Sequence, residues 1–304
     1  MYERIGQALI AGIGTGGMYG LIAMGYTLIL ACSGVFNFAQ GSILMIGTLL
    51  LYGLWVVSGI PLLLSFAILC SAGALVGVVT YFLAVRPVTN RSGVRNLTEG
   101  TLVTTLGLGL ALNTIAGEIF GYDTDPIKSY VSESALRALG LAFSYLYIVM
   151  VAVTIVIALL VDAFLRRTRV GIALRATVDD AVGATLLGVR TNRMILTSFA
   201  LGGALAALAG AMLTPITFVS VATAGGAYVL YGFAAMAIGG FGSFPGALVG
   251  GVIIGVLSTV TPVFINPNYT NLVIYAFMVI FLAIRPSGLF GVAGRFGAAR
   301  LREV

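Results

Sequence analysis

Residues 194–213 read MILTSFALGGALAALAGAML, without one charged side chain, and the uncharged run that they begin continues to residue 284. A second run, residues 5–85, also lacks Asp, Glu, Lys and Arg. A soluble protein keeps its surface mostly polar, so uncharged runs of about 80–90 residues exclude that class. Apolar runs of this length are typical of transmembrane helices, each of which needs about 20 residues. The sequence therefore predicts an all-α, polytopic membrane protein.

Composition narrows the class further. Of the 304 residues 60% are hydrophobic and 9% are charged, which leaves room for a single membrane domain, residues 1–304, and for no substantial soluble domain. The chain has no histidine, the commonest general base and metal ligand, and Cys32 and Cys70 lie in apolar segments without metal-ligand spacing. We therefore expect no enzyme, no metal site and no cofactor bound by this chain.

The apolar segments predict a bundle of eight or nine transmembrane helices, with interrupted or re-entrant segments between some of them. Glycines four residues apart, such as Gly12/Gly16, Gly73/Gly77 and Gly251/Gly255, predict that helix backbones approach closely. The predicted spans are residues 5–31, 37–58, 62–85, 99–120, 141–163, 194–213, 227–242 (the shortest), 246–262 and 269–285.

Arginine sets the expected orientation, because cytoplasmic loops are enriched in basic residues. Loop 86–98, the charged island 162–193 and the tail from Arg285 are all rich in arginine, so we expect them in the cytoplasm. The slightly acidic loop 121–140 is expected outside. Three spans before Arg86 would place the N-terminus outside, whereas a re-entrant segment near residue 37 would place it inside.

The island forms a predicted cytoplasmic loop, about residues 164–193, with a single short helix over residues 175–189. Val178, Val182 and Leu186 share one face of that helix, Asp179 and Asp180 suit its start, and Gly188 is placed to end it. Such a helix either rests on the lipid surface or docks its apolar ridge on a cytoplasmic partner. The acidic start favours docking. The candidate docking residues are Arg175, Val178, Asp179, Asp180, Val182, Leu186, Leu187, Gly188 and Val189.

Two segments interrupt the apolar pattern in similar ways, SGVFNFAQG at residues 33–41 and GGFGSFPG at residues 239–246. Matching interruptions in two halves of a transporter indicate unwound helices beside a passage, and the alternative is a pair of tight turns at the membrane surface. The candidate passage residues are Phe36, Asn37, Phe38, Gln40, Gly41, Gly240, Phe241, Ser243, Phe244 and Pro245.

Polar groups inside the spans are neutral. No Asp, Glu or Lys lies in the middle of a predicted span, which argues against a proton- or ion-driven carrier. A passage lined by neutral polar groups suits a polar or zwitterionic solute. The chain also lacks a G-x-x-x-x-G-K-[ST] motif, so ATP, if it drives transport, binds to another chain.

Four stretches of the chain form a recognisable set. They are NFAQG at 37–41 with MIG at 45–47, TTLGL at 104–108, the region from Gly171 through LLGV at 186–189 to FALGG at 199–203 and LAG at 208–210, and AIGGFGSFPGA at 237–247. In these stretches the chain resembles the permease subunits of branched-chain amino-acid ABC transporters, and the smaller of the two permease paralogues in particular.

The resemblance implies a multi-pass permease of the bacterial inner membrane with a cytoplasmic C-terminus. It implies four kinds of partner: two cytoplasmic ATP-binding subunits, a second and related permease subunit, an extracytoplasmic solute-binding protein, and the lipid bilayer, with no nucleic acid. Residues 175–189 would then correspond to the coupling loop. An importer for urea or short amides is the alternative within the family. An ATP-independent channel and a structural anchor are alternatives of other classes, which the docking-like helix and the interrupted segments disfavour.

Overall fold

The structure is a computed structural model that describes residues 2–91, 97–121, 135–138, 141–217 and 226–291. Within these ranges eight helices are long and apolar enough to cross a membrane, and a ninth apolar helix, Tyr228–Gly239, is shorter. The prediction of an all-α membrane bundle with eight or nine spans is confirmed. The arginines of the tail beyond residue 291 and most of loop 121–140 lie outside the described residues.

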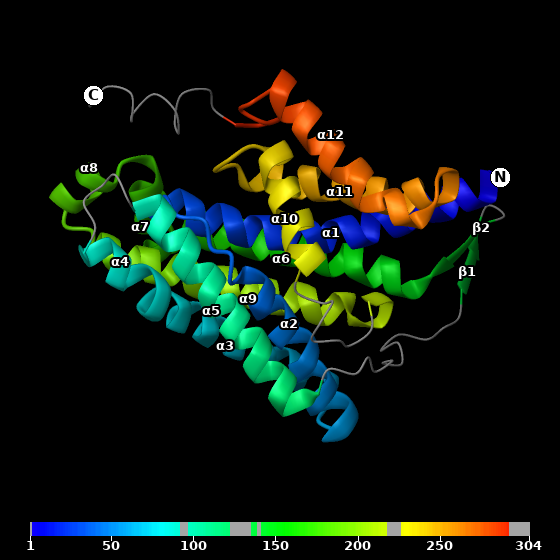
Figure 1. Ribbon diagram of the computed structural model, residues 1–304, viewed down its shortest axis with the longest axis horizontal. Coiled ribbons are helices and arrows are strands. Elements are labelled where there is room, and N and C mark those ends of the chain that lie inside the picture. The colour runs from blue at the N-terminus through cyan, green and yellow to red at the C-terminus, as the bar shows by residue number, and fades with distance from the viewer. Residues whose placement is uncertain (1, 92–96, 122–134, 139–140, 218–225, 292–304) are drawn as a thin grey trace. The chain divides into compact units, whose positions relative to one another are not determined.

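The helices form where the apolar runs predicted them, with shifts of a few residues at their ends. The span expected to start at residue 141 starts at Tyr145, because Leu141–Ser144 pairs as an antiparallel strand with Ala135–Ala138. In chain order the elements are α1 (Tyr2–Ser33), α2 (Gln40–Leu51), η1 (Tyr52–Val57), α3 (Leu62–Thr80), η2 (Tyr81–Val85), α4 (Arg86–Arg91), α5 (Leu97–Phe120), β1 (Ala135–Ala138), β2 (Leu141–Ser144), α6 (Tyr145–Arg167), α7 (Arg169–Asp179), α8 (Ala181–Leu186), α9 (Thr191–Thr217), α10 (Gly226–Gly239), α11 (Phe244–Phe264), η4 (Pro267–Tyr269) and α12 (Thr270–Ile284) (Figure 1).

The chain divides into two compact units, each built from segments far apart in the sequence. The first unit contains Met1–Thr27, Val131–Ala152 and Leu230–Val304, and the second contains Leu28–Tyr130 and Val153–Val229. Three helices, α1, α6 and α10, therefore contribute residues to both units.

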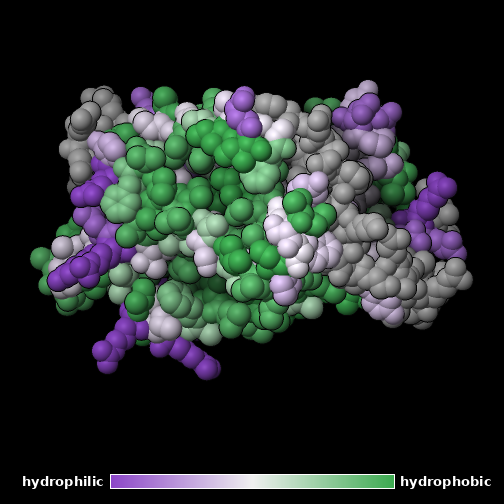
Figure 2. Space-filling model, turned by 90° about the horizontal axis from the view of Figure 1, so that it is seen from below, coloured by the Kyte–Doolittle hydropathy of each residue, from purple (hydrophilic) through white to green (hydrophobic). Residues whose placement is uncertain are grey.

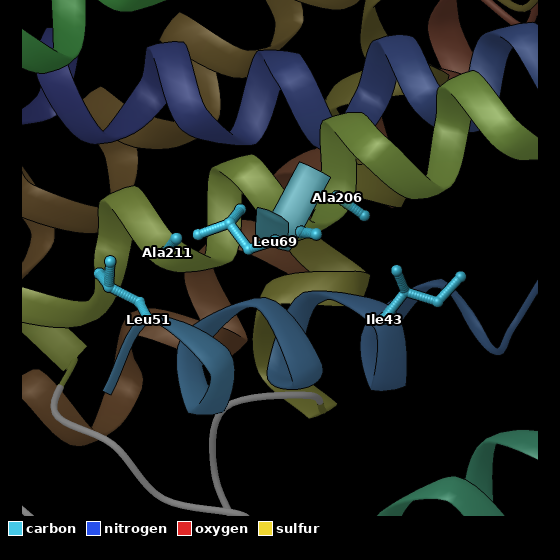
Figure 3. Packing of buried hydrophobic residues seen from close by; sticks show 6 residues of the cluster. Ile43, Leu51, Leu69, Ala206 and Ala211 are labelled. Carbon is cyan, nitrogen blue, oxygen red and sulfur yellow. The ribbon is translucent and has the colours of Figure 1, made fainter. Parts of the chain in front are cut away.

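In the second unit, α3 and α9 pack backbone against backbone. A methyl group on Gly73 would lie 2.6 Å from the carbonyl oxygen of Gly203, so only glycine permits this approach. A buried apolar cluster from α2, α3 and α9 surrounds the contact (Figure 3). Its members are Ile43, Leu51, Leu69, Ala206, Ala207 and Ala211.

In the first unit, α1 and α11 run antiparallel in the same kind of contact. A methyl group on Gly12 would lie 2.7 Å from the Cα of Val256, and one on Gly16 would lie 2.7 Å from the carbonyl oxygen of Gly251. The predicted close approach at four-residue glycine spacing is confirmed in both units.

Helices α3, α5 and α12 expose apolar side chains. Leu63, Val103 and Ile284 are 85%, 70% and 80% exposed, as expected for helices that are solvated by lipid rather than by water. Figure 2 shows many hydrophobic side chains on the surface of the described residues.

Candidate functional site

The first interrupted segment, residues 34–39, leaves helical geometry between α1 and α2, and Gly34 has a φ of 69°, which favours glycine. Its polar side chains are buried and paired with each other. Asn37 and Gln40 are both fully buried, and the Asn37 amide donates to the Gln40 side-chain oxygen at 3.2 Å. The Asn37 side-chain oxygen accepts from the Ala39 N–H at 3.1 Å. These bonds satisfy backbone and amide groups that no helix pairs.

This segment lies beside the interior of two membrane helices. The Gln40 amide donates to the carbonyl oxygen of Gly202 in α9 at 2.8 Å, and the Phe38 N–H donates to the Thr105 hydroxyl of α5 at 3.3 Å. Gly202 and Thr105 lie two to three turns after the first residues of their helices, roughly 12–16 Å along the axes. Of the two alternatives, an interruption within the membrane-spanning helices is therefore the one found here.

The second interrupted segment is different. Residues 240–243 form a turn between the end of α10 and the start of α11, with φ of 106° at Gly240 and 83° at Gly242. The chain after α12 returns to this turn: the N–H groups of Leu289 and Phe290 donate to the carbonyl oxygens of Ile238 and Gly239, at 2.8 and 3.0 Å. The final carbonyls of α10 thus gain partners.

The start of α11 follows from its sequence. The Ser243 hydroxyl accepts from the Gly246 N–H at 3.2 Å, and Pro245 lies in the first turn, where a proline fits. Residues 240–243 are thus a capped turn between the end of α10 and the start of α11. Phe241, Ser243 and Phe244 are half-buried around this turn.

The predicted single helix over residues 175–189 is wrong. The structure has two helices, α7 and α8, which meet at Asp180 in extended conformation, with φ of −155° and ψ of 102°. The Asp180 carboxylate accepts from the Val182 N–H at 3.0 Å, so it caps α8 rather than continuing α7. Val178 therefore lies on α7, and Val182 and Leu186 lie on α8.

Helix α7 packs against the other helices of the second unit through one buried face. The Thr168 hydroxyl accepts from the Gly171 N–H at 3.0 Å and caps the helix. Gly171, Leu174 and Thr177 are buried, one helical turn apart, and form the face that packs inward. Arg175 and Asp179 are exposed.

Helix α8 presents apolar side chains outward. Val182, Leu186 and Leu187 are 72%, 85% and 86% exposed, while Ala184 is buried. Gly188, at φ of 84°, ends the helix: its N–H donates to the Thr185 carbonyl, and the Val189 N–H donates to the Ala184 carbonyl, at 3.0 and 2.9 Å. This pattern is a Schellman motif, so the predicted end at Gly188 is confirmed.

The basic segments of the second unit lie at one end of it. Val85, the residue directly before α4, packs with Ile195 and Phe199 of α9. Both residues lie in the first third of α9, the helix that follows α8 in the chain. Figure 1 shows α4, α7 and α8 at that end. Loop 86–98 and the charged island thus begin on the same side, as the arginine pattern predicted. The exposed ion pair between Asp162 and Arg166, at 2.7 Å, contributes little to stability.

Sequence reasoning missed two hydroxyls. Tyr26 and Thr27 lie in the middle of an apolar run, where their type and spacing give no distinguishing signal, yet both are buried without a protein partner among the described residues. The side-chain oxygen of Asn113 is likewise buried without a partner among the described residues.

Apolar spanning helices, an interruption lined by neutral amides and a capped extramembrane pair of helices define a multi-pass membrane transport protein. Residues 8–282 match the family described as the permease component of the branched-chain amino acid transport system, and the chain belongs to this family.

The chain is similar to several curated permeases of this kind. It is 29% identical to the high-affinity branched-chain amino acid transport system permease protein LivH of Escherichia coli K12, over 94% of this chain and 95% of that protein. BraD of Pseudomonas aeruginosa, described in the same words, gives the same identity and coverage. The probable LivH of Methanocaldococcus jannaschii is 32% identical over 90% of this chain and 88% of its own. The resemblance expected from the four stretches is confirmed: the chain is a transport permease subunit.

Proposed function

We propose that this chain forms the membrane passage of an ATP-driven importer for branched-chain or related amino acids. The family to which it belongs and the names of its relatives support this solute class. The fully buried pair Asn37 and Gln40 supports a passage along residues 36–41, because unwound backbone within a membrane lies against a cavity or inside protein. Its neutral amides suit a zwitterion without net charge.

The observation that carries the coupling part of the proposal is the exposed apolar surface of α8. Val182, Leu186 and Leu187 project from a segment rich in charge, which is a costly arrangement for side chains that water alone would solvate. A groove on a cytoplasmic ATP-binding subunit would cover them. Arg175, Val178 and Asp179 lie on α7, the caps at Asp180 and Gly188 fix the two ends of α8, and Val189 leads back to α9.

The proposal includes the other subunits of the transporter. Two ATP-binding subunits supply the energy, a second and related permease completes the membrane part, and an extracytoplasmic binding protein delivers the solute. The location is the inner membrane of a bacterium, with the C-terminus in the cytoplasm. Because α1 and α11 are antiparallel and residues 285–291 adjoin the start of α11, the N-terminus then lies outside.

Reconstituted vesicles test the proposal. Vesicles that hold the complete transporter should accumulate labelled leucine only with internal ATP and external binding protein. Uptake that persists without the ATP-binding subunits would establish a channel instead. Uptake of labelled urea in place of leucine, isoleucine or valine would reassign the solute.

A further inference from the structure

Two neighbouring hydroxyl groups on α1 are buried without a protein partner. Tyr26 and Thr27 are 3% and 0% exposed, and neither hydroxyl has a hydrogen-bond partner among the described residues. They lie about two turns before Ser33, where α1 ends and the interrupted segment 34–39 begins. A buried hydroxyl without a hydrogen bond lowers stability, so the fold alone does not account for these two groups.

Other hydroxyls on the same helix are paired locally. The Thr15 hydroxyl donates to the Ala11 carbonyl at 2.9 Å, and the Ser33 hydroxyl donates to the Ile29 carbonyl at 2.7 Å, each four residues earlier. This is the usual partner of Ser and Thr in a membrane helix. Thr27 has the same option at Ala23 and does not use it. Among the serine and threonine hydroxyls of α1, that of Thr27 is the exception.

The packing of Tyr26 depends on its aromatic ring and does not require its hydroxyl. Its Cε2 lies 3.7 Å from the position that a methyl group on Gly232 of α10 would occupy, so the ring lies in van der Waals contact with that position, beside Ile22, which lies closer to it. A phenylalanine ring would fill the same space. By contrast, the hydroxyl of Tyr231 in α10 donates to the side-chain oxygen of Asn271 in α12, a bond within the fold.

We propose that the hydroxyls of Tyr26 and Thr27 hydrogen-bond the polar head of the solute during its passage. The inference rests on the proposed function, which supplies a zwitterion with a carboxylate and an ammonium group. A hydroxyl both donates and accepts, so it serves either group without carrying a charge of its own. Polar groups within membrane spans face the bundle interior or a pathway, and these two lie on the helix that leads directly into the interrupted segment.

The test removes only the hydroxyls. Tyr26→Phe and Thr27→Val are compared with the wild type in vesicles that contain the complete transporter, by leucine uptake per ATP hydrolysed and by thermal melting of the purified complex. Each variant should lower uptake per ATP by about tenfold, as expected for losing a hydrogen bond to a charged group. The melting temperature should stay equal or rise, because an unpaired buried hydroxyl is gone. Thr27→Ser, which keeps the hydroxyl, should retain uptake.

Matched controls remove hydroxyls that have partners in the fold. Tyr231→Phe, which takes the donor from the Asn271 side-chain oxygen, should lower the melting temperature while keeping uptake per ATP, and Thr15→Val, whose bond lies within its own helix, should change neither. Wild-type uptake in Tyr26→Phe and Thr27→Val would overturn the inference, and so would a loss of uptake that comes with a lowered melting temperature like that of Tyr231→Phe. Wild-type vesicles that import no branched-chain amino acid would refute the proposed function itself, and the inference with it.

Discussion

Replacing Leu186 with Asp should detach the ATP-binding subunits without harming the membrane domain. Leu186 is 85% exposed on α8, so nearly all of its side chain is available for burial by a partner. Full burial of a leucine contributes about 1.5–3 kcal/mol, and its loss, as in Leu186→Ala, should weaken association by roughly 10- to 100-fold. Because a carboxylate in an apolar groove adds a further penalty, Leu186→Asp should weaken association by more than about 100-fold.

The assay is co-purification of the ATP-binding subunits with the permease, followed by titration of the association in detergent. Ala181→Asp is the matched control, since it adds the same charge to α8, about 140° around the helix from residue 186, at an exposed first-turn position that favours an acid. The affinity of this variant for the ATP-binding subunits should stay within about threefold of that of the wild type. Equal weakening by both variants would show that charge, and not the apolar ridge, governs docking. Unchanged binding of Leu186→Asp would refute docking through α8.

Three further outcomes are expected. Gly73→Ala should destabilise the α3–α9 contact by about 1–3 kcal/mol, seen as a lower melting temperature, whereas Gly107→Ala, with open space around its added methyl group, should not. Gln40→Met should lose about 1–3 kcal/mol by leaving the buried amide of Asn37 without its acceptor, and uptake should fall with it; a wild-type melting temperature would contradict this. Asp180→Ala should weaken the cap of α8 by about 1 kcal/mol, measured as faster amide exchange, and Asp180→Asn, which keeps an acceptor oxygen, should restore protection.

Much of the fold was predictable from local properties of the chain. The apolar runs predicted the spans, and glycines four residues apart predicted the close helix contacts, because both signals depend only on residues within one helix. Gly188 was recognisable as a helix end for the same reason. The break at Asp180 was missed because the hydrophobic spacing of residues 178–189 fits one continuous helix, while the carboxylate of Asp180 prefers to cap a new one.

By itself, the sequence determined that this protein crosses the membrane many times, that loop 86–98 and the charged island begin on one side, and that a capped helix lies in that island. These features were predictable because they depend on composition, charge and turn chemistry, which are set by residues close together in the sequence. The depth of the interruption at residues 34–39 and the turn at residues 240–243 were decided only by the tertiary structure. Gln40 finds its acceptor 162 residues away, and the turn finds its donors beyond α12. Two segments that both combine glycine, a small polar residue and two phenylalanines thus differ because hydrogen-bond partners distant in sequence hold residues 34–39 against the interior of α5 and α9 and residues 240–243 in a turn beside the end of α10.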